Sequence, residues 1–358
     1  MERLGYRPAL DGLRGFSVLA VITFHAWQGL LPAGWLGVDV FFVLSGFLIT
    51  SLLVGEHQST GAVSFGRFYA RRALRLLPAL AVALAMGIGL AAVFDPSRLA
   101  ATISEGVSSA FYVSNWVTGL HADQQAVTGL LTHTWSLSIE EQFYLAWPLM
   151  LCALMRIGGR RLALYLTLIA VAGIVIHRPM VSTIGHVSMW TDTRADALLV
   201  GSALALAFSL GLVRPGRAAR LAGVAGAAAL VALALLYTYE VNGWRGMADG
   251  GYTLVAAAAA CVVMGALSGW RLPAWRPLVH IGRISYGLYL YHYPIERVLQ
   301  DRLGSGPACL ALTLLLTFSV AIVSYRFLER PFLRLKRRVA TPQPADATPI
   351  LAPVPVAA

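Results

Sequence analysis

Two polar residues, Arg14 and His25, stand within an apolar run, Leu10 to Leu30, that is long enough to span a membrane. They are eleven residues apart, so on a helix they share one face and lie about 16 Å apart along its axis. A cation or ionisable group in hydrocarbon is costly and usually marks a pathway or a reaction site. We therefore predict that this face carries the chemistry, along a continuous corridor from the arginine to the histidine.

Two further polar residues, Glu141 and His292, fall at depths similar to that of His25 when residues are counted inward from the predicted outer ends of their spans. The three side chains are expected to form one polar layer. An imidazole accepts a proton and a nearby carboxylate stabilises the resulting imidazolium, so we predict that His25 and Glu141 pair as a general base. The alternative is a structural hydrogen-bonded pair that holds helices together.

A pair of arginines, Arg72 and Arg75, lies three residues apart on one helical face at the predicted inner boundary. Guanidinium forks bind phosphate in a bidentate manner, so Arg14, Arg72 and Arg75 are predicted to hold the phosphates of a cytosolic donor. The plainer interpretation is that these arginines only mark topology or anchor lipid headgroups.

Other polar residues are predicted to contact the substrate, each with a structural alternative. Asp39 lies on the second apolar run and needs a partner if it is buried. Arg194 and Asp196 open the sixth run, either as an ion pair at the outer surface or as part of an acceptor site. Tyr286 and His292 either contact a sugar or belong to an interfacial belt of aromatic residues.

Composition favours a membrane protein, because 58% of the residues are hydrophobic and only 13% are charged. We expect an all-α, polytopic helical bundle with about ten transmembrane helices. No small-residue cleavage site follows the first apolar run, so it is expected to be retained. The predicted spans are Leu10 to Leu30, Leu36 to Val54, Ala73 to Phe94, Trp135 to Arg156, Leu162 to Ile176, Ala195 to Val213, Ala218 to Tyr237, Gly251 to Leu267, Ile284 to Leu299, and Ala308 to Leu328.

The basic residues set the predicted orientation, because most of the 28 fall in alternate connections between spans. Cytoplasmic loops accumulate Arg and Lys, so both termini are predicted to be cytoplasmic. The net charge of +11 is dispersed over short loops that face membrane lipid headgroups. No nucleic-acid partner is therefore expected.

One integral-membrane domain, residues 1–338, accounts for nearly all of the chain. Within it, Ile103 to Leu120 is apolar but short and interrupted by Glu105, which favours a re-entrant or interfacial helix over a further span. Residues 339–358 are rich in Pro and Ala and are predicted to form a disordered cytoplasmic tail. The three cysteines lie in apolar stretches without ligand spacing, so we expect packing residues and no metal site.

Several motifs occur in order along the chain, and together they are far more specific than any one alone. They are Arg-Pro-Ala-Leu-Asp-Gly-Leu-Arg-Gly from Arg7, Gly-Val-Asp-Val-Phe-Phe from Gly37, Phe-Tyr-Ala-Arg-Arg-Ala-Leu-Arg from Phe68, His-Thr-Trp-Ser-Leu-Ser-Ile-Glu-Glu-Gln-Phe-Tyr from His133, Arg194-Ala-Asp, Ile-Ser-Tyr-Gly-Leu-Tyr-Leu-Tyr-His-Tyr-Pro from Ile284, and Glu329-Arg-Pro. In these motifs the chain resembles the acyltransferase family 3 proteins of membranes, from about Arg7 to Phe332.

The resemblance implies transfer of an acetyl or other short acyl group from acyl-CoA to a hydroxyl, commonly of a sugar. It implies that His25 is the reaction-site histidine and that Arg14, Arg72 and Arg75 are donor-site arginines. A bacterial cytoplasmic-membrane location follows from the same resemblance. Some relatives carry a fused extracytoplasmic hydrolase-like domain, which this chain is expected to lack, so a separate extracytoplasmic partner protein is expected to complete any transfer that needs one.

The leading hypothesis is direct acyl transfer, in which the pantetheine arm of acyl-CoA runs along the face of Arg14 and His25. His25, assisted by Glu141, then deprotonates the acceptor hydroxyl. A cell-surface glycan is the preferred acceptor, and tailoring of a macrolide-type antibiotic is the alternative. A transporter or flippase without acyl chemistry is the alternative from another class, although the sequence shows no duplicated halves with matching broken helices.

Overall fold

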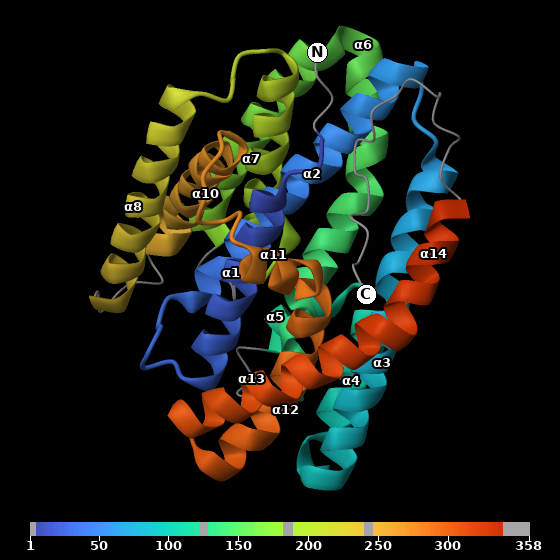
Figure 1. Cartoon of the computed structure of the whole chain (residues 1–358), viewed down its shortest axis with the longest axis vertical. Helices are drawn as coiled ribbons and strands as arrows, with labels where there is room; N and C mark the ends of the chain where they lie inside the picture. Colours follow the sequence, from blue (N-terminus) through green and yellow to red (C-terminus); the bar gives the residue numbers. More distant parts are fainter. Residues whose placement is uncertain (1–4, 122–127, 182–188, 240–245, 339–358) are drawn as a thin grey trace.

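The computed structural model describes residues 5–121, 128–181, 189–239 and 246–338, and every element in these ranges is helical. The helices lie side by side as an elongated bundle (Figure 1), which confirms the all-α prediction. They are α1 (Pro8–Ala26), α2 (Gly37–Thr60), α3 (Phe65–Phe94), α4 (Leu99–Ala110), α5 (Ser114–His121), α6 (Trp135–Val181), α7 (Thr191–Ser209), α8 (Arg217–Tyr239), α10 (Tyr252–Leu267), α11 (Arg276–Arg283), α12 (Ser285–Leu303), α13 (Pro307–Ser324) and α14 (Arg330–Arg338). Short 3-10 or π segments precede or join them: η1 (Gly34–Leu36), η2 (Pro96–Arg98), η4 (Thr132–Thr134), η5 (Met247–Gly251) and η6 (Tyr325–Glu329).

Within the described ranges, seven helical stretches are long and apolar enough to cross a membrane. This supports a multi-pass membrane protein. The predicted spans on α7 and α12 are not among the seven, because both helices carry several charged residues. The predicted number of ten spans therefore remains a prediction.

Residues Trp135–Val181, labelled α6, contain two of the predicted spans as two helical segments joined at a kink. The backbone leaves the helical region at Gly158 and Gly159, and Gly159 has a φ of 70°, which favours glycine. The kink lies between the predicted spans Trp135 to Arg156 and Leu162 to Ile176. The two halves of α6 thus correspond to the two predicted runs.

Close packing of α2 against α7 depends on two glycines. A Cβ atom at Gly46 would lie 1.9 Å from the carbonyl oxygen of Leu198, and one at Gly201 would lie 2.1 Å from that of Val43. Small residues let membrane helices approach at backbone distance. This contact brings the polar residues at the starts of α2 and α7 together.

The apolar segment Ile103 to Leu120 forms parts of two short helices, α4 and α5. The chain turns between them, where Tyr112 has a φ of 55°. Their 12 and 8 residues are too few to cross a bilayer, and they pack against α3 and α6 respectively. The structure therefore has no further span at this point.

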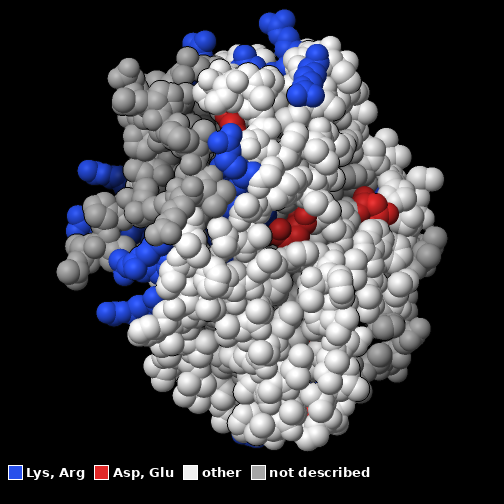
Figure 2. Space-filling model, turned by 90° about the vertical axis from the view of Figure 1, so that its right-hand side faces the viewer, with Lys and Arg blue, Asp and Glu red and all other residues white. Residues whose placement is uncertain are grey.

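Basic residues concentrate toward one end of the molecule. Figure 2 shows Lys and Arg on the upper part and along one flank of the face in view, while its lower part is almost free of charged side chains. Helix α1 begins and α14 ends on the side of that upper end (Figure 1). Both facts agree with termini on one side, and the cytoplasmic assignment remains a prediction. The predicted tail, residues 339–358, lies outside the described residues.

Candidate active site

A cavity of about 320 Å³ opens between the first half of α1 and helices α2, α3, α6 and α7. Its lining includes all three predicted donor arginines, Arg14, Arg72 and Arg75. Tyr286 on α12 also lines it and donates its hydroxyl to the Leu76 carbonyl at 3.2 Å. Residues predicted from three separate motifs are thus brought to one cavity.

The carboxylates of α6 that face this cavity are already engaged. The Arg72 guanidinium donates to Glu141, with Nη2 at 2.7 Å from Oε1, and lies 3.1 Å from the centre of the Tyr144 ring. Glu140 accepts hydrogen bonds from the hydroxyls of Ser45 and Tyr144. Arg72 is therefore neutralised and held in place.

By contrast, Arg14 and Arg75 have no carboxylate partner among the described residues. The Arg14 Nε atom is buried and lacks a hydrogen-bond partner within the same ranges. Asp11 also lines the cavity, but its carboxylate accepts from the Tyr6 hydroxyl at 2.9 Å. The lining also carries the carboxylates of Asp11 and Glu140, which are held by hydroxyls and not by a cation, so the cavity is of mixed charge. The guanidinium groups of Arg14 and Arg75 stay outside direct ion pairs in the described ranges, and such groups can bind an anionic ligand.

The predicted pair of His25 and Glu141 is wrong, because Glu141 binds Arg72 in the cavity. The depth of His25 was counted from a predicted span end at Leu30. Helix α1 ends at Ala26, so His25 lies in its last turn. Glu141 lies in the second turn of α6, deeper in the bundle.

The structure does not show the predicted continuous corridor, because His25 is not among the residues that line this cavity. Tyr289 lies one turn beyond Tyr286 on α12, between the cavity and His25. Its hydroxyl donates to the His133 carbonyl at 3.0 Å and lies 2.5 Å from the Ser136 hydroxyl. Along α12, Tyr289 therefore stands between Tyr286, which lines the cavity, and His292, whose ring lies beside His25.

Around His25 the structure gathers a cluster of rings, hereafter the histidine cluster: His25, His133, His292 and Tyr293. The ring centres of His25 lie 5.2 Å from those of both His292 and Tyr293. His133 lies 5.4 Å from His292 and 4.9 Å from Tyr293. The predicted proximity of His25 and His292 is thus confirmed, whereas Glu141 is not part of the layer.

His133 was missed as a site residue, although it begins one of the quoted motifs. It precedes the predicted span Trp135 to Arg156, so a search for polar residues inside spans passed over it. The motif itself was the signal that it mattered.

Each histidine of the cluster is anchored to a backbone carbonyl through one ring nitrogen. The bonds are Nδ1 of His25 to Val21 at 3.0 Å, Nε2 of His133 to Leu290 at 3.2 Å, and Nδ1 of His292 to Tyr289 at 2.6 Å. Because a carbonyl oxygen only accepts, those nitrogens carry the protons and the other nitrogens carry lone pairs. The His25 lone pair is therefore on Nε2, which has no hydrogen-bond partner in the described ranges.

A second charged cluster lies at the N-terminal ends of α2 and α7, away from the arginine-lined cavity. Its contacts contradict another prediction. Arg194 and Asp196 do not form an outer-surface pair, because each is only 1% exposed and bound elsewhere. Arg194 donates to Asp39 at 2.8 Å, and Arg178 lies 2.5 Å from Asp196. Residues two apart on a helix point to different neighbours, which explains the separate pairs. The partner expected for a buried Asp39 is thus Arg194.

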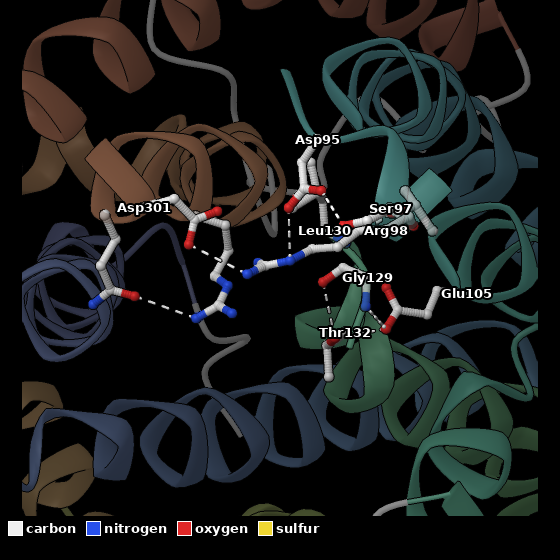
Figure 3. Close-up of polar contacts among 11 residues, drawn as sticks. Asp95, Ser97, Arg98, Glu105, Gly129, Leu130, Thr132 and Asp301 are labelled. Atoms are coloured by element: carbon white, nitrogen blue, oxygen red, sulfur yellow. Dashed lines mark hydrogen bonds and ion pairs between the residues drawn. The ribbon is translucent and has the colours of Figure 1, made fainter. Parts of the chain in front are cut away.

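Glu105 of α4 holds the loop before α6 through hydrogen bonds. Figure 3 shows the Glu105 side chain of α4 directed at this loop, where it accepts hydrogen bonds from the backbone of Gly129 at 2.9 Å and from the hydroxyl of Thr132 at 2.7 Å. The Leu131 amide donates to the other carboxylate oxygen at 2.8 Å. Burial raises the pKa of Glu105 above its usual value, while these donors oppose the shift.

Comparison with known proteins agrees with this arrangement of motifs. A family model described as an acyltransferase domain matches residues 7–326. YrhL of Bacillus subtilis (strain 168) is 34% identical over 361 residues, covering 93% of this chain and 57% of its own. O-acetyltransferase OatA of Staphylococcus aureus (strain NCTC 8325 / PS 47) is 33% identical over 347 residues, covering 91% of this chain and 57% of its own.

Peptidoglycan O-acetyltransferase OatA of Listeria monocytogenes (serovar 1/2a, strain EGD-e) is 32% identical over 354 residues, covering 91% of this chain and 56% of its own. The chain thus spans less than two thirds of the length of these relatives. No solved structure matches it.

Proposed function

Since the chain belongs to the acyltransferase family whose model matches residues 7–326, we propose that it moves an acetyl or other short acyl group from acyl-CoA to a hydroxyl of a cell-surface glycan. The relative from Staphylococcus aureus is named for O-acetylation and the one from Listeria monocytogenes for O-acetylation of peptidoglycan, which supports a glycan acceptor. The helices that are able to cross a membrane support a location in the bacterial cytoplasmic membrane.

The observation that carries this proposal is the convergence of Arg14, Arg72 and Arg75 on one cavity. Arg14 and Arg75 lack carboxylate partners in the described ranges, so they are the groups that would contact the donor phosphates. Arg72, neutralised by Glu141, would set the shape of the phosphate site rather than supply its charge. Its stacking on Tyr144 fixes its direction.

The thioester has to travel from this cavity to His25, about 16 Å along α1. That distance suits an extended pantetheine arm. Tyr289, which is hydrogen-bonded to Ser136 and to the His133 carbonyl, follows the cavity-lining Tyr286 by one turn of α12, and we expect donor binding to displace its side chain. Side-chain displacement of this kind belongs with the conformational steps that gate many active sites.

His25 is proposed to act as general base through Nε2, because Nδ1 is committed to the Val21 carbonyl. Nε2 takes the proton of the acceptor hydroxyl as its oxygen attacks the thioester carbonyl carbon. The new C–O bond forms, the C–S bond breaks, and the departing thiolate takes the proton back from His25. The His292 lone pair, 3.4 Å from His25 Nδ1, helps to stabilise the transient imidazolium.

The direct test uses the purified protein in detergent with acetyl-CoA and an N-acetylglucosamine oligosaccharide. Thiol release and the mass of the acceptor are measured together. We expect His25→Ala to lower turnover about 100-fold or more. His280 is a matched control, because its Nδ1 binds the Arg276 carbonyl four residues earlier in the same way but on an exposed helix face. His280→Ala should leave turnover unchanged. Full turnover in His25→Ala would refute the base role.

A further inference from the structure

His133 has a buried ring nitrogen that neither the fold nor the proposed base mechanism uses. The side chain is 3% exposed, its Nε2 donates to Leu290, and its Nδ1 has no hydrogen-bond partner in the described parts of the chain. An unsatisfied buried acceptor is unfavourable unless a ligand supplies a donor. This lone pair therefore marks a place where a hydrogen-bond donor belongs.

Tyr293 contacts both the His133 ring and the His25 ring. Its ring stacks on His133 at 4.9 Å with an angle of 26° between the planes, and it meets His25 edge-on at 5.2 Å and 88°. His133 and His25 thus lie against the same tyrosine, and both also contact His292. A molecule whose hydroxyl reaches His25 Nε2 has His133 close beside it.

Access to this pair differs from access to the arginine-lined cavity. His25 and Tyr293 are half-buried, whereas His133 and His292 are buried, so the cluster is reached past His25 and Tyr293. None of the four residues lines the cavity. The donor cavity and the histidine cluster are therefore two separate approaches to one reaction site.

We infer that His133 Nδ1 and the Tyr293 ring form the acceptor subsite, which selects an acceptor carrying a second hydrogen-bond donor next to the hydroxyl that is acylated. The neighbouring donor is a hydroxyl or an amide N–H, as in a vicinal diol or an amino sugar. His133 stacks on the Tyr293 ring and the Arg297 guanidinium lies 6.0 Å from its centre, so Tyr293 positions His133 at the border of the subsite. This inference rests on the proposed function and names the substrate feature that the site reads.

The surroundings hold His133 rigidly enough for such a role. Hydrogen bonds to Glu105 hold Gly129 and Thr132 (Figure 3), which lie shortly before His133. The Leu131 amide donates to the same carboxylate. The His133 carbonyl accepts from the Tyr289 hydroxyl. A recognition group that is fixed on both its backbone and its ring is preorganised for its ligand.

Two substitutions separate the two nitrogens of His133. In His133→Gln the side-chain amide reaches the Nε2 position and can still donate to Leu290, but nothing accepts at the Nδ1 position. We expect the acceptor KM to rise about tenfold, with the donor KM and acceptor-independent hydrolysis of acetyl-CoA unchanged. In His133→Asn the carbonyl oxygen occupies the Nδ1 position, and part of the acceptor affinity should return.

A matched pair of acceptors makes the test specific. The KM of methyl N-acetylglucosaminide is compared with the KM of analogues that lack one hydroxyl or the amide. Each KM is measured with the wild-type protein and with His133→Gln. We expect one analogue to raise the wild-type KM about tenfold and to abolish the difference between wild type and variant. The wild-type comparison stands even where a variant fails to fold.

The outcomes distinguish this inference from the proposed function. An enzyme that depends on His25, but whose acceptor KM is the same in wild type and a folded His133→Gln variant, would overturn the acceptor subsite alone. Equal wild-type KM for all acceptor analogues would also overturn it. Transfer that survives His25→Ala would instead remove the proposed base mechanism.

Discussion

Two groups of arginines and carboxylates lie inside the bundle, and they differ in how their charges are matched. Near the start of α1, Arg14 and Arg75 face a cavity without carboxylate partners among the described residues. At the other ends of α2 and α7, Arg194 binds Asp39 and Arg178 binds Asp196, all buried. The first group borders a cavity and leaves two guanidinium groups outside direct ion pairs, whereas every charge of the second group has a direct partner.

The difference teaches that residue type does not separate a ligand site from a structural one, but charge balance does. Buried ion pairs are tolerated when each charge has its partner, and their loss is costly. An unmatched cation beside a cavity is stable only because the cavity admits water or an anion. We therefore propose ligand binding for the arginine-lined cavity and helix packing for the buried pairs.

The largest effect should come from breaking a buried pair. Asp39→Ala leaves Arg194 as an uncompensated buried charge, which typically costs about 3–5 kcal/mol of stability. We expect a clear fall in Tm and in the yield of monodisperse protein in detergent, measured by thermal denaturation and size exclusion. The double variant Asp39→Ala/Arg194→Met should recover much of the loss. A Tm equal to wild type for Asp39→Ala would contradict a structural role.

Removing an arginine that has no carboxylate partner should affect donor binding and leave stability nearly unchanged. Arg14→Gln takes away a charge without leaving a buried partner, so we expect Tm to stay near the wild-type value. The donor KM should rise about tenfold or more, because a charge-assisted phosphate contact is worth about 1.5–3 kcal/mol. Steady-state kinetics with acetyl-CoA measure this directly. An unchanged donor KM would remove Arg14 from the donor site.

Arg72 lies between these two cases, because it lines the cavity and is also paired with Glu141. Arg72→Gln should lower Tm by less than Asp39→Ala, since the pair is partly exposed, and should raise the donor KM by less than Arg14→Gln. Thermal denaturation and donor kinetics on one preparation test both parts. Arg72→Gln together with Glu141→Gln should restore the lost stability but not the donor KM.

The smallest effect concerns salt. Raising ionic strength from about 0.05 to 0.5 M screens exposed charges more than buried ones. We expect the donor KM to rise a few-fold, with the acceptor KM nearly constant. An acceptor KM that rises in parallel would indicate that screening acts outside the arginine-lined cavity.

Some of this site could be predicted from the sequence. The membrane helices follow from apolar runs, and the proposed binding of donor phosphates by Arg14, Arg72 and Arg75 rests on residue type and on the family motifs. We predicted that these three arginines lie close together, and in the structure all three line one cavity. The nearness of His25 and His292 also followed from their depths.

The pairings between helices could not be predicted. Whether Asp196 meets Arg178 or Arg194 depends on the rotation and contacts of α6, α7 and α10, which no local pattern in one sequence fixes. The supposed pair of His25 and Glu141 failed because α1 ends at Ala26, four residues earlier than the apolar run. Element ends are the least certain part of a sequence-based prediction.

The most direct test of the account is a structure of the protein with a non-hydrolysable thioether analogue of acetyl-CoA. The account predicts the phosphates at Arg14 and Arg75, the Tyr289 side chain displaced from Ser136, and the acyl carbon within reach of His25 Nε2. An analogue bound elsewhere, or one seated in the cavity with its acyl end still separated from His25 by Tyr289, would contradict it.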